Sequence, residues 1–281
     1  MAQFEVATSQ LECSQHSTCE ECASQIDNDY NCRWCFTSQS CVPSKYMCHP
    51  WKTVLDRINC PRDIPNTYND SFNRNIIAYY IQAANRVPIY SPYEAVIEEA
   101  LSCLRKTGEK TEILSRVEVP MSIDGNKISY LVAVNRDFGH IVVAVTATNH
   151  FTQLMAQTAT VFLAMMDEIA LGGKVMTYYA QGYQSVINNN FNEKLANAIE
   201  KFPDFEILLT GHSLGGAMAT ILSLHVARSF PNKHVKLCTW SAPRIGDVEF
   251  AKLHMENVHE SYRVVRDGDF VPDSPMRVSQ N

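Results

Sequence analysis

The chain has 281 residues, of which 46% are hydrophobic and 19% are charged, and its formal net charge is −6. This composition is typical of a globular protein with one large domain or a large and a small one, and it argues against long disorder. The acidic balance and the lack of a block of five basic residues argue against nucleic-acid binding, and no apolar stretch reaches the roughly 18 residues that span a bilayer.

Cysteine is concentrated near the start of the sequence. Eight of the ten cysteines lie within residues 13–60, and they are Cys13, Cys19, Cys22, Cys32, Cys35, Cys41, Cys48 and Cys60. A module of about 50 residues cannot bury enough apolar surface to be stable on its own, so this cluster predicts disulfide cross-links. Two Cys-x-x-Cys spacings also suit zinc, and a zinc module is the alternative. The sequence leaves the pairing of the eight cysteines open.

A disulfide-rich module implies an oxidising, extracellular compartment. The first five residues lack the basic and apolar regions of a signal peptide, so we expect an incomplete or trimmed N-terminus. Residues 61–66 form a polar, proline-bounded joint. This joint predicts a cysteine-rich module at 11–61 and a second domain at 66–281. Just after it, Asn69-Asp70-Ser71 is an N-glycosylation sequon, consistent with the surface of a secreted protein.

Apolar spacing predicts the elements of the second domain in chain order. Helices are expected at 71–84 and 92–106, followed by strands at 129–135 and 141–147 with a turn at 137–139 between them. The later elements are a helix around 191–199, a strand at 205–210, a helix at 216–230 and strands at 235–240 and 262–266. Strands that alternate with helices, several of them apolar on both faces, predict an α/β fold with a mainly parallel sheet.

An apolar strand, the run Gly211-His212-Ser213-Leu214-Gly215 and a helix rich in small residues together have the pattern of a nucleophile elbow. A serine hydroxyl is a weak nucleophile, which must be presented to a base and to donors that stabilise the oxyanion. The glycines let the turn close, and the start of the helix places amides and a positive dipole end under the developing charge. We therefore predict Ser213 as the nucleophile and the amide of Leu214 as an oxyanion donor.

Two further segments support a family resemblance. Together with the elbow, the segments 241–247 (Ser-Ala-Pro-Arg-Ile-Gly-Asp) and 269–272 (Asp-Phe-Val-Pro) resemble motifs of the class 3, fungal-type lipases. The similarity runs from about Tyr68 to the C-terminus and implies an α/β hydrolase fold. The N-terminal cysteine pattern, with Cys-Arg-Trp-Cys at 32–35, resembles the plexin–semaphorin–integrin (PSI) module, which is extracellular.

The lipase resemblance implies further site residues. Asp269 matches the triad acid and follows a predicted strand, with Asp267 as the immediate rival. Thr148 lies where the family keeps an oxyanion hydroxyl in an Arg-Gly-[Ser/Thr] motif, but this chain reads Thr146-Ala147-Thr148. The alanine adds a Cβ where the backbone must lie close to the substrate. No metal or cofactor is needed for such chemistry.

The triad histidine is missing from its expected place. In the family it follows the acid by several tens of residues, whereas residues 270–281 of this chain contain no histidine. His150 is the alternative base, since it lies two residues after Thr148. We expect instead that the domain is truncated and that the base lies beyond Asn281, so that this chain as it stands shows little or no activity.

The other histidines are not expected to serve as the base. His259 precedes the 262–266 strand and therefore lies at the opposite end of the sheet. The side chain of His212 should diverge from that of Ser213, and His225 and His254 are expected to be surface or partly buried residues. Residues 151–171 occupy the lid position of the family, and their Met and Phe side chains either contact lipid and gate the pocket or pack on the core.

The sequence thus predicts a secreted, lipase-like carboxylic ester hydrolase that acts on acylglycerols or related lipid esters, either in solution or at a lipid–water interface. The alternative is a non-catalytic extracellular relative that binds lipid or a partner. The altered Thr148 stretch and the missing histidine favour this alternative, whereas the intact elbow argues against it.

Overall fold

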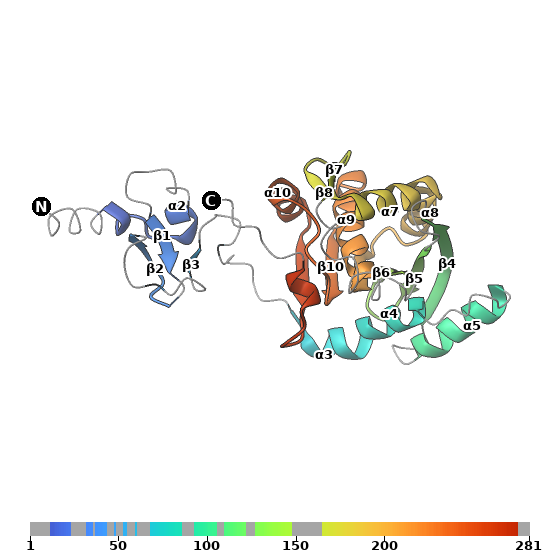
Figure 1. Cartoon of the computed structure of the whole chain (residues 1–281). Helices are drawn as coiled ribbons and strands as arrows, with labels where there is room; N and C mark the ends of the chain where they lie inside the picture. Colours follow the sequence, from blue (N-terminus) through green and yellow to red (C-terminus); the bar gives the residue numbers. More distant parts are fainter. Residues whose placement is uncertain are drawn as a thin grey trace, which may run out of the picture. The chain divides into compact units, whose positions relative to one another are not determined.

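The computed structural model describes residues 12–23, 32–35, 37–43, 48, 53–54, 60, 68–85, 93–105, 110–121, 127–147 and 165–274. The chain divides into two compact units, Met1–Thr67 and Tyr68–Asn281 (Figure 1). Among the helices in these stretches, none is long and apolar enough to cross a bilayer.

The first unit is a small disulfide-linked domain. Its sheet has the strand order β2-β1-β3 and is antiparallel, and its elements are α2 (Cys19–Ala23), β1 (Cys32–Cys35), β2 (Ser40–Pro43) and β3 (Thr53–Val54). The expected disulfides are confirmed, in the pairs Cys13–Cys32, Cys19–Cys60, Cys22–Cys41 and Cys35–Cys48. These eight sulfurs are therefore not free thiolates that could hold zinc. The likeness to a PSI module stays a prediction.

A six-stranded sheet with the order β11-β10-β9-β6-β5-β4 forms the centre of the second unit. Its strands are β4 (Thr111–Pro120), β5 (Lys127–Asn135), β6 (His140–Ala147), β9 (Glu206–His212), β10 (Val235–Trp240) and β11 (Glu260–Val264). Strands β6, β9, β10 and β11 are parallel, whereas β5 is antiparallel to both its neighbours. The predicted mainly parallel sheet is confirmed. The register pairs Val145 with Gly211, His212 with Trp240 and Trp240 with Val264, so the four parallel strands end at one edge.

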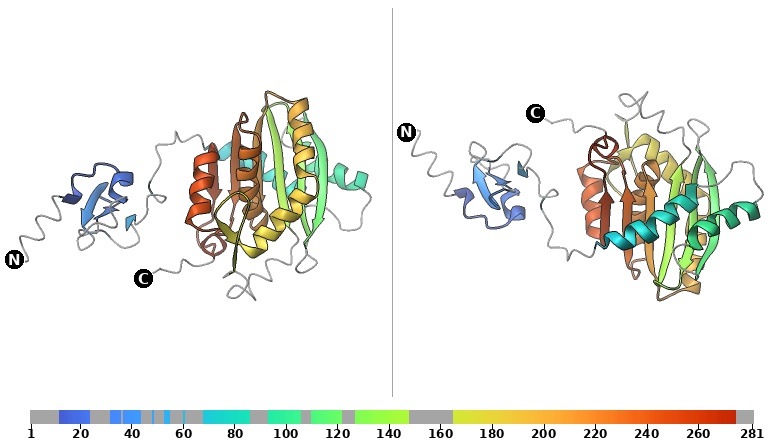
Figure 2. Two further views of the ribbon diagram at one scale, coloured as in Figure 1. Left: turned by 90° about the horizontal axis from the view of Figure 1, so that it is seen from above. Right: turned by 90° about the horizontal axis from the view of Figure 1, so that it is seen from below.

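Helices cover both faces of this sheet (Figure 2). On one face lie α7 (Thr177–Asn188), α8 (Phe191–Lys201), α9 (Leu214–Ser229) and α10 (Val248–Asn257), preceded by the hairpin of β7 (Met166–Glu168) and β8 (Lys174–Met176). On the other face lie α3 (Asp70–Phe72), the π-helical η3 (Asn73–Ile77), α4 (Ala78–Asn85) and α5 (Tyr93–Leu104). Strand residues alternate between the two cores: Val132 and Val143 face the first, and Leu131 and Val142 face the second. Burial on both faces explains why these strands are continuously apolar.

The structure adds elements that the periodicity did not predict. The helix expected at 71–84 runs from Asp70 to Asn85 and contains a π-helical stretch, while β4, α7 and α10 were not predicted at all. Strand β4 lies at the edge of the sheet and is mostly half-buried, with a register shift between Ile113 and Ser115. An edge strand needs less apolar surface, which weakens its signal in the sequence.

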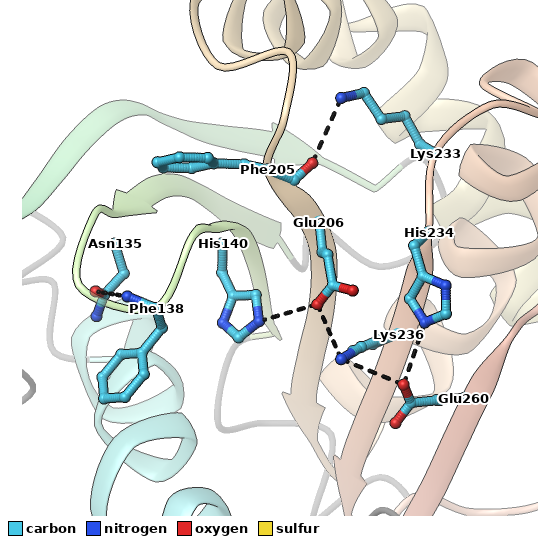
Figure 3. Close-up of polar contacts among 9 residues, drawn as sticks. All are labelled: Asn135, Phe138, His140, Phe205, Glu206, Lys233, His234, Lys236 and Glu260. Carbon is cyan, nitrogen blue, oxygen red and sulfur yellow. Dashed lines mark hydrogen bonds and ion pairs between the residues drawn. The ribbon is translucent and has the colours of Figure 1, made fainter.

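Charged side chains gather at the amino ends of the parallel strands, at the edge opposite the elbow (Figure 3). Lys236 Nζ lies 2.9 Å from Glu206 Oε2 and 3.2 Å from Glu260 Oε1. His140 Nε2 is 3.4 Å from Glu206 Oε2, and His234 Nε2 is 3.1 Å from Glu260 Oε1. Burial alone would lower the pKa of Lys236, but the two carboxylates outweigh it and raise that pKa. This network ties β6, β9, β10 and β11 together at their starts.

Candidate active site

Ser213 lies at the sharp turn between β9 and α9. Its backbone has φ 53° and ψ −123°, a conformation that an L-residue keeps only where the surroundings enforce it. The amide of Ser213 donates to the carbonyl of Trp240 at 2.9 Å, and its own carbonyl accepts from the amide of Ala217 at 3.0 Å. These two bonds fix the turn to β10 on one side and to α9 on the other. Ser213 is thereby held at the carboxyl edge of the sheet.

Glycine is required around the turn because three backbones come close together. A Cβ on Gly211 would lie 2.3 Å from the carbonyl oxygen of Gly215, and a Cβ on Gly215 would lie 2.2 Å from the carbonyl oxygen of Val145. Both distances are far below van der Waals contact, and both neighbours are backbone atoms that cannot swing away. The elbow is therefore packed directly against the end of β6, where an oxyanion residue is expected.

The amino terminus of α9 offers donors at this point. Leu214 is its first residue, and the first four amides of a helix have no intrahelical acceptor. The helix has 16 residues, so the positive end of its dipole also lies here. The second predicted donor, Thr148, lies outside the described residues. Nearby, the hydroxyl of Thr146 donates to the side-chain oxygen of Asn85, so β6 ends in a hydrogen bond to α4.

Asp269 lies on the loop after β11, which we call the acid loop (residues 265–274). The amide of Asp269 donates to the carbonyl of Arg266 at 3.1 Å, closing a turn in which Gly268 has φ +77°. Its Oδ1 accepts from the amide of Val271 at 3.0 Å. The polar side chain of Ser241 is the main cause that lowers the pKa of Asp269, and the amide of Val271 adds to this effect. The carboxylate is thus held ionised beside the end of β10.

Arg244 braces the acid loop from the segment that follows β10. Its amide donates to the carbonyl of Ser274 at 2.9 Å, and its guanidinium lies 3.1 Å from Asp273 Oδ1. Asp273 ends the short 3-10 helix η5 (Val271–Asp273), in which Pro272 is buried. The two segments that resemble the lipase motifs are therefore bound to each other in space.

His212 is the described histidine whose charge acts on Asp269. Burial lowers the pKa of His212, and the negative charge of Asp269 opposes this effect. In the described part of the chain, however, the side chain of Asp269 accepts a hydrogen bond from the amide of Val271 rather than from a histidine. The described residues thus place Ser213 and Asp269, the predicted nucleophile and acid, at the ends of β9 and β11, and no described histidine is hydrogen-bonded to Asp269.

The remaining histidines are structural or lie elsewhere. His225 and His254 were expected at the surface or partly buried, but both are buried. His225 Nε2 lies 2.7 Å from the side-chain oxygen of Asn192, which fixes the proton on Nε2, and Tyr183 donates to Nδ1 at 2.9 Å. His259 accepts from the amide at the start of β10, at the far edge of the sheet. The alternative base His150 lies outside the described residues.

Other predicted features lie away from this edge or are only partly described. Asn69 is exposed and precedes α3. Of the lid segment 151–171, only residues 165–171 are described; Met165 is 63% exposed, whereas Leu171 is buried. Asp267, the rival acid, is exposed in the turn before Asp269. Ser241 opens the segment 241–247 that resembles a lipase motif, but the sequence predicted no role for its side chain.

Similarity to known proteins in sequence and in fold agrees with this geometry. The family described as lipase (class 3) matches residues 142–279. This chain is similar to class 3 lipases. The matched segment contains the elbow, Arg244 and the acid loop.

Curated relatives are also lipases. Lipase ZK262.3 of Caenorhabditis elegans is 26% identical over 203 residues, which is 70% of this chain and 56% of that protein. Secreted mono- and diacylglycerol lipase 1 of Fusarium solani is 31% identical over 109 residues, or 38% of this chain and 32% of that protein. The chain thus spans about half of the first relative and a third of the second.

Solved lipase structures share the fold. The triacylglyceride lipase of Rhizomucor miehei aligns with a TM-score of 0.59 and 21% identity over 74% of this chain and 76% of that chain. Lip2 lipase of Yarrowia lipolytica aligns with a TM-score of 0.60 and 21% identity over 75% and 76%. The predicted α/β hydrolase fold is therefore confirmed for the second unit.

Proposed function

We propose that this chain is a secreted serine hydrolase that cleaves carboxylic esters of acylglycerols or related lipids. The observation that supports this most is the backbone of Ser213, which is held in a strained turn at the start of α9. A strained residue at a sharp strand-to-helix turn is the geometry that a nucleophile elbow requires. The names of the lipase relatives support a lipid ester as the substrate.

In the proposed reaction, Ser213 Oγ attacks the ester carbonyl carbon and loses its proton to a histidine. The C–O bond to the alcohol then breaks, and the same histidine returns the proton to the leaving alkoxide. The proposed histidine lies outside the described residues. Asp269 orients it and stabilises its charged form. Water then hydrolyses the acyl-serine ester by the reverse sequence.

The oxyanion of the tetrahedral intermediate would be bound by the amide of Leu214, which has no intrahelical acceptor, and by Thr148. The four disulfides of the first unit support an oxidising compartment, because such bonds persist outside the cytosol. The likeness of this unit to an extracellular PSI module is part of the same proposal.

A fluorophosphonate probe tests the proposal, since it modifies only an activated serine. The natural secreted protein should be labelled on Ser213 and should hydrolyse p-nitrophenyl and monoacylglycerol esters. Ser213→Ala should abolish both, and Asp269→Asn should slow them by about 10³-fold or more. Asp267→Asn, in the neighbouring acid, is the matched control and should leave both rates within about twofold. An unlabelled wild-type protein would instead support a non-catalytic lipid- or partner-binding relative.

A further inference from the structure

A bulge in the edge strand β4 turns two consecutive side chains toward the same face of the sheet. Ile113 is paired with Ala133 and Ser115 with Val132, so Leu114 is the extra residue between them. Val132 faces the core on the side of α8, and Ala133 faces the opposite core. Leu114 also packs against the core on the side of α8. The bulge therefore directs both Leu114 and Ser115 toward α8.

A hollow of about 170 Å³ lies between this bulge and α8. It is lined by two strand residues and by four helix residues at the spacing i, i+3, i+4 and i+7, which are Leu114, Ser115, Lys194, Asn197, Ala198 and Lys201. This spacing places the four helix residues on one face of α8. Leu114 and Ala198 supply the apolar part of the lining, and the other four side chains carry hydrogen-bond donors. None of the six lining residues is acidic.

The hydroxyl of Ser115 is buried and has no hydrogen-bond partner among the described residues. A buried donor without a partner destabilises the folded protein, and most such groups find one. The next residues of β4 that face the same core, Val117 and Val119, are apolar. An apolar residue would also fill the position of Ser115 without this cost. The serine is therefore better explained by a ligand than by folding.

The two lysines of the hollow lack the partners that other lysines of the protein have. Carboxylates pair with Lys110, Lys127, Lys174 and Lys236. Neither Lys194 nor Lys201 forms an ion pair among the described residues. Two ammonium groups and a buried hydroxyl, in a lining without a carboxylate, favour an oxyanion with two negative charges.

We propose that the hollow between β4 and α8 binds a phosphate group, either as free phosphate or as the phosphate monoester at the head of a lipid. A phosphate monoester carries a charge of about −1.5 to −2 at neutral pH, which two lysines match, whereas a carboxylate carries only one charge. Its oxygens would accept from Lys194, Lys201, Asn197 and the hydroxyl of Ser115. The oxygen of Ser115 is covered in the unliganded protein, and the lysine side chains, the longest and most flexible of the lining, move aside to admit the ligand.

This site is separate from the proposed ester chemistry. Strands β5 and β6 lie between β4 and β9, the strand that leads to Ser213. Phosphate binding and ester hydrolysis can therefore be tested independently.

Calorimetric titration of the natural secreted protein with inorganic phosphate, at neutral pH and constant ionic strength, tests the site. We expect saturable binding that is about tenfold tighter than the binding of acetate, because the second charge of phosphate is matched by the second lysine. The double variant Lys194→Gln/Lys201→Gln should weaken phosphate binding by about tenfold or more. Lys252→Gln is the matched control, at an exposed lysine of α10 that also forms no ion pair among the described residues, and should bind within about twofold of wild type.

Ser115→Ala separates a role in binding from a role in folding. The alanine removes a buried donor that has no partner, so the melting temperature should stay the same or rise. Phosphate should nevertheless bind about tenfold more weakly, because a hydrogen bond to a charged group is lost. A lower melting temperature together with unchanged phosphate binding would show that the hydroxyl serves the fold and would overturn its role in the site.

Vesicles distinguish the two sources of phosphate. Sedimentation with phosphatidylcholine vesicles that contain phosphatidic acid, but not with pure phosphatidylcholine vesicles, would assign the lipid source if the double lysine variant abolishes it. Binding of inorganic phosphate without binding to either kind of vesicle would assign the free source. Wild-type protein that binds neither inorganic phosphate nor the vesicles with phosphatidic acid would overturn the site. Equal affinity for phosphate and acetate, or phosphate binding unchanged in the double lysine variant, would overturn it as well.

Discussion

Single residues at the elbow are constrained by the backbones around them. At Gly215, a methyl group would lie 2.2 Å from the carbonyl oxygen of Val145. At Gly139, in the turn between β5 and β6, the backbone has φ +66° but the nearest atom to a methyl group is 4.0 Å away. Substituting the two glycines in turn therefore distinguishes the effect of a steric clash, at Gly215, from the effect of a left-handed backbone, at Gly139.

We predict that Gly215→Ala lowers the free energy of unfolding by about 3 kcal/mol, because β6 and α9 must move apart to admit the methyl group. It should also abolish labelling of Ser213 by the fluorophosphonate. Gly139→Ala is the control and should lower the free energy of unfolding by only about 1 kcal/mol, from its left-handed backbone, with labelling unchanged. Urea unfolding and probe labelling measure both effects. Equal destabilisation by the two variants would contradict the close approach of β6 to the elbow.

Local motifs made some site residues predictable from the sequence and left others out. Ser213 and Asp269 stand in short motifs that carry their own turn and strand signals, and the structure places both at one edge of the sheet. Their catalytic roles stay predictions. The burial of His225 depends on Tyr183 and Asn192, which come from α7 and α8, and no local pattern reveals it. The positive φ of Ser241 is equally invisible until β10 and β11 are paired.

Asn69, the residue before α3, combines a helix cap with an N-glycosylation sequon. Asn69 Oδ1 accepts from the amide of Phe72 at 2.9 Å, which caps the helix, and Asn69 is also the acceptor of the sequon Asn69-Asp70-Ser71. Glycosylation joins a sugar to the side-chain nitrogen and leaves the carbonyl oxygen in place. The cap and a glycan are therefore chemically compatible.

We predict that the secreted protein carries an N-glycan on Asn69 while the cap persists. Digestion with an amidase specific for N-glycans should increase the electrophoretic mobility of wild type but not that of Ser71→Ala, which destroys the sequon and keeps the cap. Asn69→Ala should lower the free energy of unfolding by about 1 kcal/mol relative to Asn69→Asp, since aspartate retains a capping oxygen and neither variant can be glycosylated. A wild-type protein unaffected by the amidase would refute the glycan, and equal stability of the two Asn69 variants would refute the cap.

Elements were predictable where one physical signal dominated. Strands β6 and β10 are buried on both faces, so their apolar runs matched the observed strands within one residue. Strand β4 was missed because an edge strand alternates weakly and carries charges such as Glu112 and Arg116. The start of α10 was also not predicted, although its N-cap is a common one: the side-chain Oδ1 of Asp247 accepts from the amide of Phe250 at 2.8 Å.

The two units are stabilised by different means. The first unit has four disulfides around a small core that includes Trp34. The described part of the second unit contains two cysteines, Cys103 and Cys238, and both are free and buried in the core between the sheet and α4–α5. Burial raises the pKa of the Cys238 thiol to about 12, so this thiol is protonated and unreactive at neutral pH. Reduction and alkylation should therefore affect the first unit alone.

We predict that reducing the intact protein unfolds the first unit and leaves the second unit folded. Each native disulfide of a small domain contributes about 2–5 kcal/mol, which is more than such a core can replace. Hydrogen exchange read by mass spectrometry should show amides of β1 and β2 losing protection after reduction and alkylation, while those of β6, β9 and β10 keep theirs. Cys103→Ser removes one of the two described thiols of the second unit and so tests whether that thiol reacts during the treatment. In this variant the protection of β6, β9 and β10 should also not change on reduction. Loss of protection in both units together would show that the lipase-like fold depends on the disulfide-linked domain for its stability.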